Sequence, residues 1–269
     1  MKKKCPISLV IMTGNNTRHK YFANKLIEVF DVKGVVSETK RAPSQTDNAE
    51  DERLIEEHFE ERERKELHYF PNNDSFNLSQ DVMLRVPMGE SNSRRAFNFV
   101  AAKKPNFVVL FGTSIIRDPL LSHLDKRMMN IHLGLSPYYR GSGTNFWPLV
   151  NNEPECVGAT IHLAVLKVDA GPILCQVRPE RLSITDNVHD IGCKTIIAGT
   201  EAMIKCIKAY HEGKIVPREQ KQGGLLYKLK DFNIQALLKL RSNFKKGMLE
   251  EYLDKKNERD ALKPIIELK

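Results

Sequence analysis

Short apolar runs alternate along the chain with longer segments whose apolar residues recur every three or four positions. The clearest runs cover residues 7–12, 32–36 and 106–111. Runs of this length are typical of strands buried on both faces of a parallel sheet, and the longer segments have the period of amphipathic helices. The alternation predicts an α/β fold with a doubly wound, mostly parallel, Rossmann-like sheet.

Three segments carry the helical period, at residues 18–30, 93–104 and 187–210. The first follows a polar turn, Gly14-Asn-Asn-Thr17, that ends the first predicted strand. Two interpretations of this turn stay open. It is either a tight turn with Thr17 as the helix N-cap, or a loop whose amides bind a phosphate or carboxylate. On the second interpretation Asn15 and Asn16 are candidate substrate-binding residues.

Residues 47–66 are the most highly charged segment, with ten acidic and four basic residues. Its less polar positions have only loose helical spacing, which favours a solvated helix packed by a narrow stripe. A lid over the functional cleft is the alternative.

The composition changes after residue 213. Residues 214–269 contain fourteen Lys or Arg against eight Asp or Glu. Apolar residues spaced three or four apart predict one helix over residues 234–252, and they are Leu237, Leu240, Phe244, Met248 and Tyr252. We therefore expect a main domain over residues 1–212 and a basic, helical extension over residues 213–269. The extension should dock on the main domain or on a second subunit of a homodimer.

Charge and cysteine content narrow the class of protein. The 269 residues carry a net charge of +8, which suits phosphorylated or nucleotide-bearing partners, nucleic acid or an anionic membrane surface equally well. Five scattered cysteines without CxxC spacing favour reduced thiols in the cytoplasm over a disulfide scaffold or zinc site. No window reaches the roughly 18 apolar residues of a membrane-spanning helix. A soluble, cytoplasmic protein is expected.

The candidate chemistry lies between residues 130 and 176. Asn130 and His132 are two positions apart on a predicted strand over residues 128–131, so both side chains leave one face. Glycine and proline residues follow, so His132 should enter a loop at the strand end, where open α/β sheets place their sites. Asp169 comes 37 residues after His132, ahead of a Gly-Pro turn. Alone, His132 would more often be structural, but Asn130 and Asp169 favour a catalytic role.

The surrounding motifs resemble those of the folate-dependent formyltransferases. They are Asn130-Ile-His, Leu135-Ser-Pro, Tyr139-Arg-Gly, Thr160-Ile-His and Asp169-Ala-Gly-Pro-Ile, in that order. The resemblance implies a formyltransferase catalytic domain in residues 1–212 that takes a formyl group from 10-formyltetrahydrofolate and gives it to an amine.

The resemblance also implies a role for each site residue. Asn130 would donate to the developing oxyanion, and a protonated His132 would do the same and exchange protons. Asp169 would orient the imidazole and relay the proton of the amine. The end of the strand at residues 106–111 would line the folate pteridine pocket, with Gly112, Thr113, Ser114, Ile115 and Ile116 as its wall.

Four further expectations concern neighbouring residues. His162 is either structural or a group that supports Asp169. Arg140 is a candidate for gripping substrate phosphate, or else it braces its own loop through backbone carbonyls. Trp147 is a substrate-pocket or core residue rather than a stacking platform, which makes nucleic acid an unlikely partner. The other histidines share no metal-ligand spacing, so no metal is expected.

Two departures from other branches of the family narrow the choice of the amine that receives the formyl group. The turn Gly14-Asn-Asn-Thr17 differs from the glycine-rich phosphate loop of the purine-pathway enzymes, and the expected helical extension differs from the β-barrel of methionyl-tRNA enzymes. The resemblance then favours the amino group of a nucleotide-linked aminosugar, for surface polysaccharide biosynthesis. Methionyl-tRNA, another amine, or hydrolysis of formyltetrahydrofolate are the alternatives.

Overall fold

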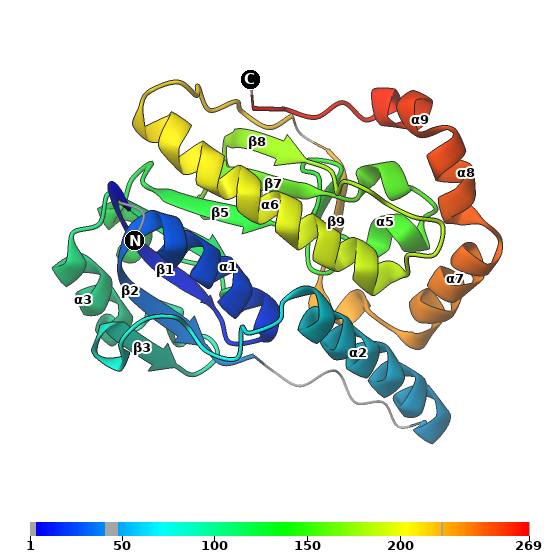
Figure 1. The fold of residues 1–269 in the computed structure, drawn as a ribbon, viewed down its shortest axis with the longest axis horizontal. Coiled ribbons are helices and arrows are strands. Elements are labelled where there is room, and N and C mark those ends of the chain that lie inside the picture. Colours follow the sequence, from blue (N-terminus) through cyan, green and yellow to red (C-terminus); the bar gives the residue numbers. More distant parts are fainter. Residues whose placement is uncertain (1–3, 41–47, 222, 269) are drawn as a thin grey trace.

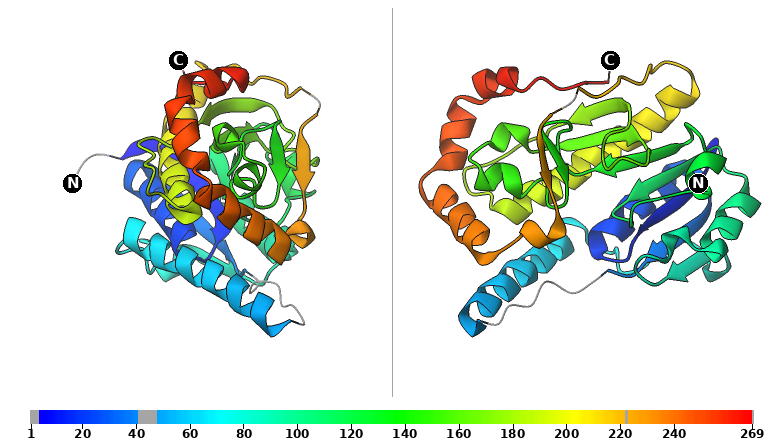
Figure 2. Two further views of the ribbon diagram at one scale, coloured as in Figure 1. Left: turned by 90° about the vertical axis from the view of Figure 1, so that its right-hand side faces the viewer. Right: turned by 180° about the vertical axis from the view of Figure 1, so that it is seen from behind.

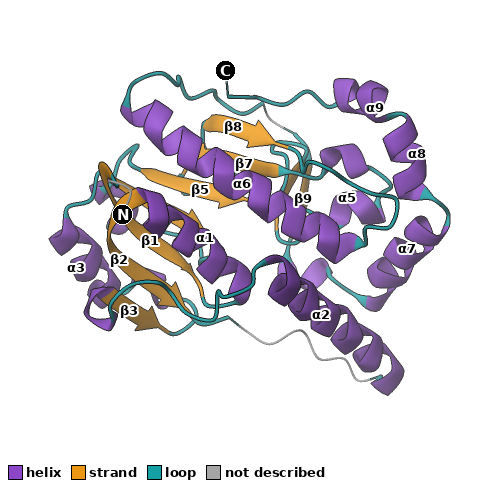
Figure 3. Cartoon of the chain, viewed as in Figure 1, coloured by secondary structure: helices purple, strands orange, loops and turns teal. Residues whose placement is uncertain are grey.

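A seven-stranded sheet forms the centre of the computed structural model, which describes residues 4–40, 48–221 and 223–268 (Figure 1, Figure 3). The strand order is β3-β2-β1-β4-β5-β7-β8. Neighbouring strands from β3 to β5 are parallel, whereas β7 is antiparallel to both β5 and β8. The predicted doubly wound, mostly parallel sheet is confirmed. The strands are β1 (Cys5–Gly14), β2 (Phe30–Glu38), β3 (Met83–Val86), β4 (Phe107–Phe111), β5 (Met128–His132), β7 (Ala159–Leu163) and β8 (Ile173–Val177).

Helices cover both faces of this sheet. On one face lie α1 (Thr17–Val29) and α6 (Val188–His211), and on the other lie α3 (Arg94–Lys103) and the short α4 (Leu120–His123) (Figure 1, Figure 2). Successive side chains of each strand point to opposite faces of the sheet, so each strand contributes to the core under both helix layers. In β1, Leu9 and Ile11 pack with α1 and α6, whereas Val10 and Met12 pack with α3.

The same alternation places the candidate site. In β5, Met129 and Ile131 pack in the core under α6. Asn130 and His132 therefore leave the opposite face, and in β7 their register partners are His162 and Thr160. Polar side chains of two adjacent strands thus share one face of the sheet, away from α6.

The charged segment forms α2 (Ala49–Tyr69), and residue 47 of the predicted range lies outside the described residues. Only Ile55, His58 and Glu66 are buried in it, which agrees with a solvated helix packed by a narrow stripe. Its N-terminal half extends beyond the sheet (Figure 1). Motion of α2 as a lid stays a prediction.

The prediction of one helix over residues 234–252 is wrong. Two helices, α7 (Ile234–Lys245) and α8 (Met248–Asp254), are separated by Gly247, whose φ of 82° is left-handed and ends the helical path. A third helix, α9 (Lys256–Leu262), follows. The apolar stripe nevertheless shares one face, because Leu237, Leu240, Met248 and Tyr252 are all buried.

That stripe packs on elements from residues 1–212 of the same chain. It forms a second core with Ile55 of α2, Ile191 of α6 and residues of α5 (Trp147–Val150). The extension also contains a strand, β9 (Leu225–Tyr227), which pairs in parallel with β6 (Tyr139–Gly141). Segments 84 or more positions apart in the sequence are therefore joined beside the site.

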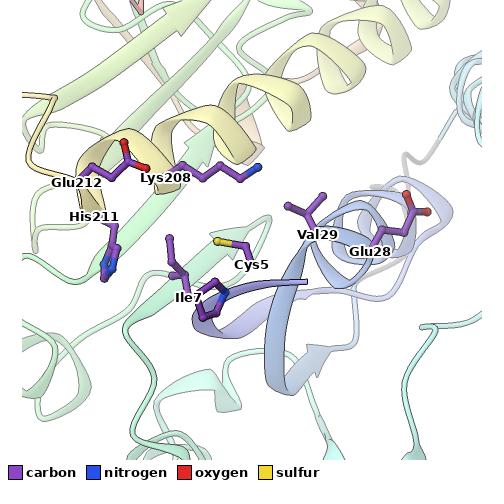
Figure 4. A pocket seen from close by; sticks show the side chains of 8 residues that line it. Cys5, Ile7, Glu28, Val29, Lys208, His211 and Glu212 are labelled. Carbon is purple, nitrogen blue, oxygen red and sulfur yellow. The ribbon is translucent and has the colours of Figure 1, made fainter. Parts of the chain in front are cut away.

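Two further features bear on partners. No helix in residues 4–40, 48–221 or 223–268 is long and apolar enough to cross a membrane. A pocket of about 540 Å³ opens where β1 begins, next to the last turn of α6 (Figure 4). It lies at the end of the sheet opposite His132, so it takes no part in the candidate site. Its lining residues are Cys5, Pro6, Ile7, Glu28, Val29, Lys208, His211 and Glu212.

Candidate active site

The structure brings Asn130, His132 and Asp169 together at the carboxyl end of β5. The Asp169 Oδ2 atom lies 3.2 Å from His132 Nδ1, and the Asn130 amide nitrogen lies 3.5 Å from Asp169 Oδ1. All three side chains are mostly shielded from solvent; that of Asp169 is 11% exposed. An amide, an imidazole and a carboxylate therefore form one cluster in a protected environment.

Asp169 reaches this cluster from the loop between β7 and β8, residues 164–172. Its φ of 46° is left-handed, a conformation that Asp adopts more readily than most residues other than glycine. The Gly141 N–H donates to Asp169 Oδ2 over 3.0 Å, and this bond ties the loop to β6. The carboxylate is thus fixed by its own backbone and by a donor from a second loop.

His132 is held between two acceptors. Its Nε2 lies 3.0 Å from the Tyr139 carbonyl oxygen, which can only accept, so Nε2 carries a hydrogen. The proton that His132 can exchange is then the one on Nδ1, next to Asp169. Burial lowers the pKa of His132, and the Asp169 charge opposes that effect.

Asp169 is ionised in this arrangement. Burial acts to raise its pKa, but the neighbouring His132 and the Gly141 N–H, which donates to Oδ2, outweigh burial and hold the pKa well below the usual range. The site therefore combines a permanent negative charge with an imidazole whose Nδ1 can gain or lose a proton.

His162 lies directly behind the cluster. Its Nδ1 is 2.9 Å from the Leu163 carbonyl oxygen and so must donate, which leaves Nε2 as an acceptor. The Asn130 amide donates to that Nε2 over 3.0 Å, and Asp169 Oδ1 lies 3.5 Å away. His162 thus contacts both Asn130 and Asp169, and its role as a supporting group stays a prediction.

The predicted cofactor wall lies beside this cluster, because β4 and β5 are parallel neighbours and their carboxyl ends meet. Its five residues differ in exposure. Gly112 and Ile115 face solvent, Ile116 is buried in the core, and Thr113 is intermediate. The Ser114 hydroxyl and N–H both donate to the buried carboxylate of Glu38. An open backbone and an exposed apolar side chain fit a flat, partly apolar ligand such as a pteridine.

Arg140 and Trp147 lie in different surroundings. Arg140 belongs to β6, and its Nε is buried without a hydrogen-bond partner among the described residues. The next residue along β6, Gly141, donates its backbone N–H to the Asp169 carboxylate. Trp147 is only 7% exposed and stacks on Tyr227 with ring centroids 4.2 Å apart. Its indole belongs to the second core.

Asn15 and Asn16 lie where the strand order reverses, at the carboxyl end of β1. Asn16 is the N-cap residue of α1, so the alternative with Thr17 as the cap is wrong, since Thr17 is the first helical residue. The Asn16 Oδ1 is buried and unpartnered within the described part of the chain. Asn15 lines a pocket of about 250 Å³ with Lys20, Ser37, Thr39, Asp74, Ser75, Phe76, Gln80, Met83 and Arg85.

His19 had no predicted role, yet it fills the crevice between β1 and β4. It is 2% exposed and packs edge-on against Phe111, and burial holds its pKa well below the ordinary value. A Cβ atom at either Gly14 or Gly112 would lie 2.5 Å from its ring. These two glycines, one at the end of β1 and one directly after β4, were the signal in the sequence.

The described residues contain no group of three or more His, Cys, Asp or Glu arranged to hold a metal ion.

Comparisons with known proteins agree with this geometry. A family profile described as formyl transferase matches residues 9–207. Methionyl-tRNA formyltransferase of Clostridium beijerinckii is 26% identical over 164 residues, which are 58% of this chain and 51% of that protein. Formyltetrahydrofolate deformylase 2 of Arabidopsis thaliana is 26% identical over 200 residues, 74% of this chain and 52% of that protein. The chain spans about half the length of these curated relatives.

A solved structure shares the fold. The N-formyltransferase of Helicobacter canadensis, in complex with folinic acid and dTDP-3-aminofucose, superimposes with a TM-score of 0.53 at 17% identity. The match covers 83% of this chain and 72% of that one. Because the family profile covers most of the chain and includes Asn130, His132 and Asp169, this protein belongs to the formyl transferase family.

Proposed function

We propose that this protein transfers a formyl group from 10-formyltetrahydrofolate to a primary amine, most favourably the amino group of a nucleotide-linked aminosugar. The observation that carries the proposal is the cluster of Asn130, His132 and Asp169 at the carboxyl end of β5. The amine is its own nucleophile, so the protein has to supply oxyanion stabilisation and proton transfer, and the cluster contains groups for both.

The steps follow from the atoms in the cluster. The amine nitrogen attacks the formyl carbon, and the bond from that carbon to the folate nitrogen breaks. A proton leaves the amine and one reaches the departing folate nitrogen, so the proton count balances. The Asn130 amide is a neutral donor for the oxyanion, and the Nδ1 of His132 with Asp169 is the place where a proton can be held.

The folate would lie against residues 112–116, the exposed backbone at the neighbouring strand end. Bound there, 10-formyltetrahydrofolate supplies the formyl group. Ile115, which is 48% exposed, offers an apolar contact.

The environment of Arg140 favours an amine substrate that carries phosphate. Its buried, unpartnered Nε lies on the strand adjoining the Asp169 contact, and the chain has a net charge of +8. Asn15, Asn16 and the pocket that Asn15 lines would provide further polar contacts. Trp147 would affect substrate binding indirectly, because its indole packs in the second core with Tyr139 of β6. The Helicobacter canadensis relative binds a nucleotide-linked aminosugar, which favours the same class here. The proposal also includes a cytoplasmic location, a role in surface polysaccharide biosynthesis and assembly as a homodimer.

A panel of acceptors tests the proposal directly. Purified protein is given 10-formyltetrahydrofolate with nucleotide-linked aminosugars, with methionyl-tRNA, or with no amine, while tetrahydrofolate release and the mass of each acceptor are followed. Release that depends on an aminosugar, together with its formylated mass, supports the proposal. Equal release without any amine indicates a hydrolase instead, and formylated methionyl-tRNA identifies the other acceptor.

Arg140→Lys then tests the phosphate contact. A lysine keeps the charge but cannot form two parallel hydrogen bonds. A raised KM for the aminosugar with an unchanged folate KM supports phosphate binding, whereas a rise in both constants points to a structural role.

A further inference from the structure

A glutamine from the segment after α6 contacts the loop that carries Asp169. The Gln220 amide nitrogen donates to the Asp169 carbonyl oxygen over 2.9 Å and to the Gly171 carbonyl oxygen over 2.6 Å. Both bonds join backbone atoms of the loop to a side chain about 50 positions away in the sequence. The peptide units between Asp169 and Ala170 and between Gly171 and Pro172 are thereby held by one group.

The segment that carries Gln220 is itself fixed to the sheet. Arg218 and Ile173 exchange two backbone hydrogen bonds, of 2.7 Å and 2.8 Å, as an antiparallel bridge to β8. Gln220 is two residues beyond this bridge. Its position is therefore set by the strand that ends the Asp169 loop.

The orientation of the Gln220 amide follows from its partners. Carbonyl oxygens can only accept, so the NH₂ group must face both of them. The Gln220 Oε1 then points the other way, and it is buried without a hydrogen-bond partner among the described residues. A buried acceptor of this kind is costly unless the bonds on the other side of the amide are needed.

Those bonds act on a strained residue. Asp169 is an L residue in the left-handed region, with φ of 46°, a conformation that persists only when its surroundings hold it. The direction of its carboxylate toward His132 depends on that backbone conformation. Losing the two Gln220 bonds would let the loop relax and move Oδ2 away from Nδ1.

We propose that Gln220 is a positioning residue that holds the backbone of residues 169–171 so that the Asp169 carboxylate faces His132. The inference rests on the proposed function, in which Asp169 acts in formyl transfer. It also assigns a role to the first part of the C-terminal extension, whose segment 218–220 completes the site from outside the strands.

Kinetics of Gln220→Ala and Gln220→Glu test the proposal. Each removes the two donors, since a carboxylate cannot donate, and Gln220→Glu keeps the shape of the side chain. Each should lower kcat roughly 10- to 100-fold, the size of effect that a misplacement of about 1 Å has on a catalytic group. The KM values for folate and amine should stay within about twofold, because neither ligand contact is removed. The matched control is Glu219→Ala, at the exposed neighbouring position.

The outcomes are separable. If kcat falls no more than in Glu219→Ala, or if KM rises while kcat holds, Gln220 does not position Asp169. Thermal melting separates lost stability from lost positioning. Should Gln220→Ala fail to fold, the near-isosteric Gln220→Glu carries the test.

A double variant separates this inference from the proposed function. If Asp169→Ala alone retains kcat, the assignment of Asp169 fails whatever Gln220 does. If Asp169→Ala lowers kcat but leaves a measurable residual rate, adding Gln220→Ala should lower that rate no further, because both changes remove the same contribution. A further drop in the double variant would show that Gln220 acts through another group and would overturn the inference.

Discussion

Asp169 Oδ2 lies 3.2 Å from His132 Nδ1, although His132 ends β5 and Asp169 belongs to the loop that follows β7, the antiparallel neighbour of β5. The contact is possible because Asp169 adopts a left-handed backbone conformation and Gly141 donates to the same oxygen. The opposite nitrogen of His132 is tied to the Tyr139 carbonyl. A protein acceptor therefore faces each nitrogen of the imidazole, and the geometry of the pair depends on β5, β6 and the loop of Asp169 together.

The first prediction concerns this pair. Asp169→Asn keeps the shape of the side chain but removes its charge, and His132→Asn removes the proton exchanged beside it. Each should lower kcat at least about 100-fold with a nearly unchanged folate KM, because the lost interactions act mainly on the transition state. Steady-state kinetics with 10-formyltetrahydrofolate measure the effect. His123→Asn, at an exposed histidine, is the control. A variant within about threefold of the parent would show that the pair is not catalytic.

The second prediction concerns Gly141. A Cβ atom there would lie 2.0 Å from the Tyr227 carbonyl oxygen, and φ is 92°. Gly141→Ala should therefore separate β6 from β9, cost on the order of 2 kcal/mol of stability and lower kcat, because the Gly141 N–H no longer reaches Asp169. Chemical denaturation and kinetics measure both effects.

A matched glycine tests the reasoning. Gly192 lies in α6, and a Cβ atom there meets nothing within 4 Å. Gly192→Ala should be neutral or stabilise the protein by about 0.5–1 kcal/mol. Equal effects at the two glycines would contradict the packing argument for Gly141.

Much of this arrangement could be predicted from the sequence. The buried strands were evident because a parallel sheet covered on both faces needs continuous apolar runs. The two-residue spacing of Asn130 and His132 placed both on one face, as observed. The break at Gly247 could not be predicted from the apolar stripe, since spacings of four fit one helix or two. Gln220 gave no signal, because its bonds to Asp169 and Gly171 span about fifty residues without any periodic pattern.

The third prediction concerns pH. His58 of α2 and His189 of α6 are buried, with their ring centroids 4.4 Å apart and their planes tilted by 50°. Burial, with the nearby charges of Arg62 and Arg241, lowers the pKa of His58 to about 4. Burial, His58 and Arg62 lower the pKa of His189 to about 3 against the opposing charge of Asp190. Both rings are therefore neutral in the folded protein at mildly acidic pH.

The direction of the change in stability with pH follows from the protons bound by the folded and unfolded states. Below about pH 6.5 the unfolded histidines bind protons and the folded ones do not, so stability falls as pH drops from about 6.5 to 4. The contribution of His58 alone is about 3 kcal/mol. Denaturation midpoints at several pH values should show this loss, and His58→Leu should reduce it. His68→Leu, at an exposed position of the same helix, is the control. An unchanged slope in His58→Leu would contradict the assignment.

The last prediction concerns how α7, in residues 213–269, is held against the rest of the chain. Leu237 is 1% exposed in the second core, whereas its neighbour Leu238 is 43% exposed. Leu237→Ala should cost about 2–5 kcal/mol, because it leaves a cavity between α7 and the main domain, and Leu238→Ala should cost less than about 1 kcal/mol. The second core also contains Ile55, Leu149 and Ile191, so the loss of stability should appear in the single unfolding transition of the whole chain.

Urea denaturation followed by both tryptophan fluorescence and circular dichroism measures this loss of stability. Trp147 lies in the same core and reports on it directly. If Leu237→Ala instead frees only the extension, fluorescence and circular dichroism will separate into two transitions, and the extension will be shown to unfold on its own.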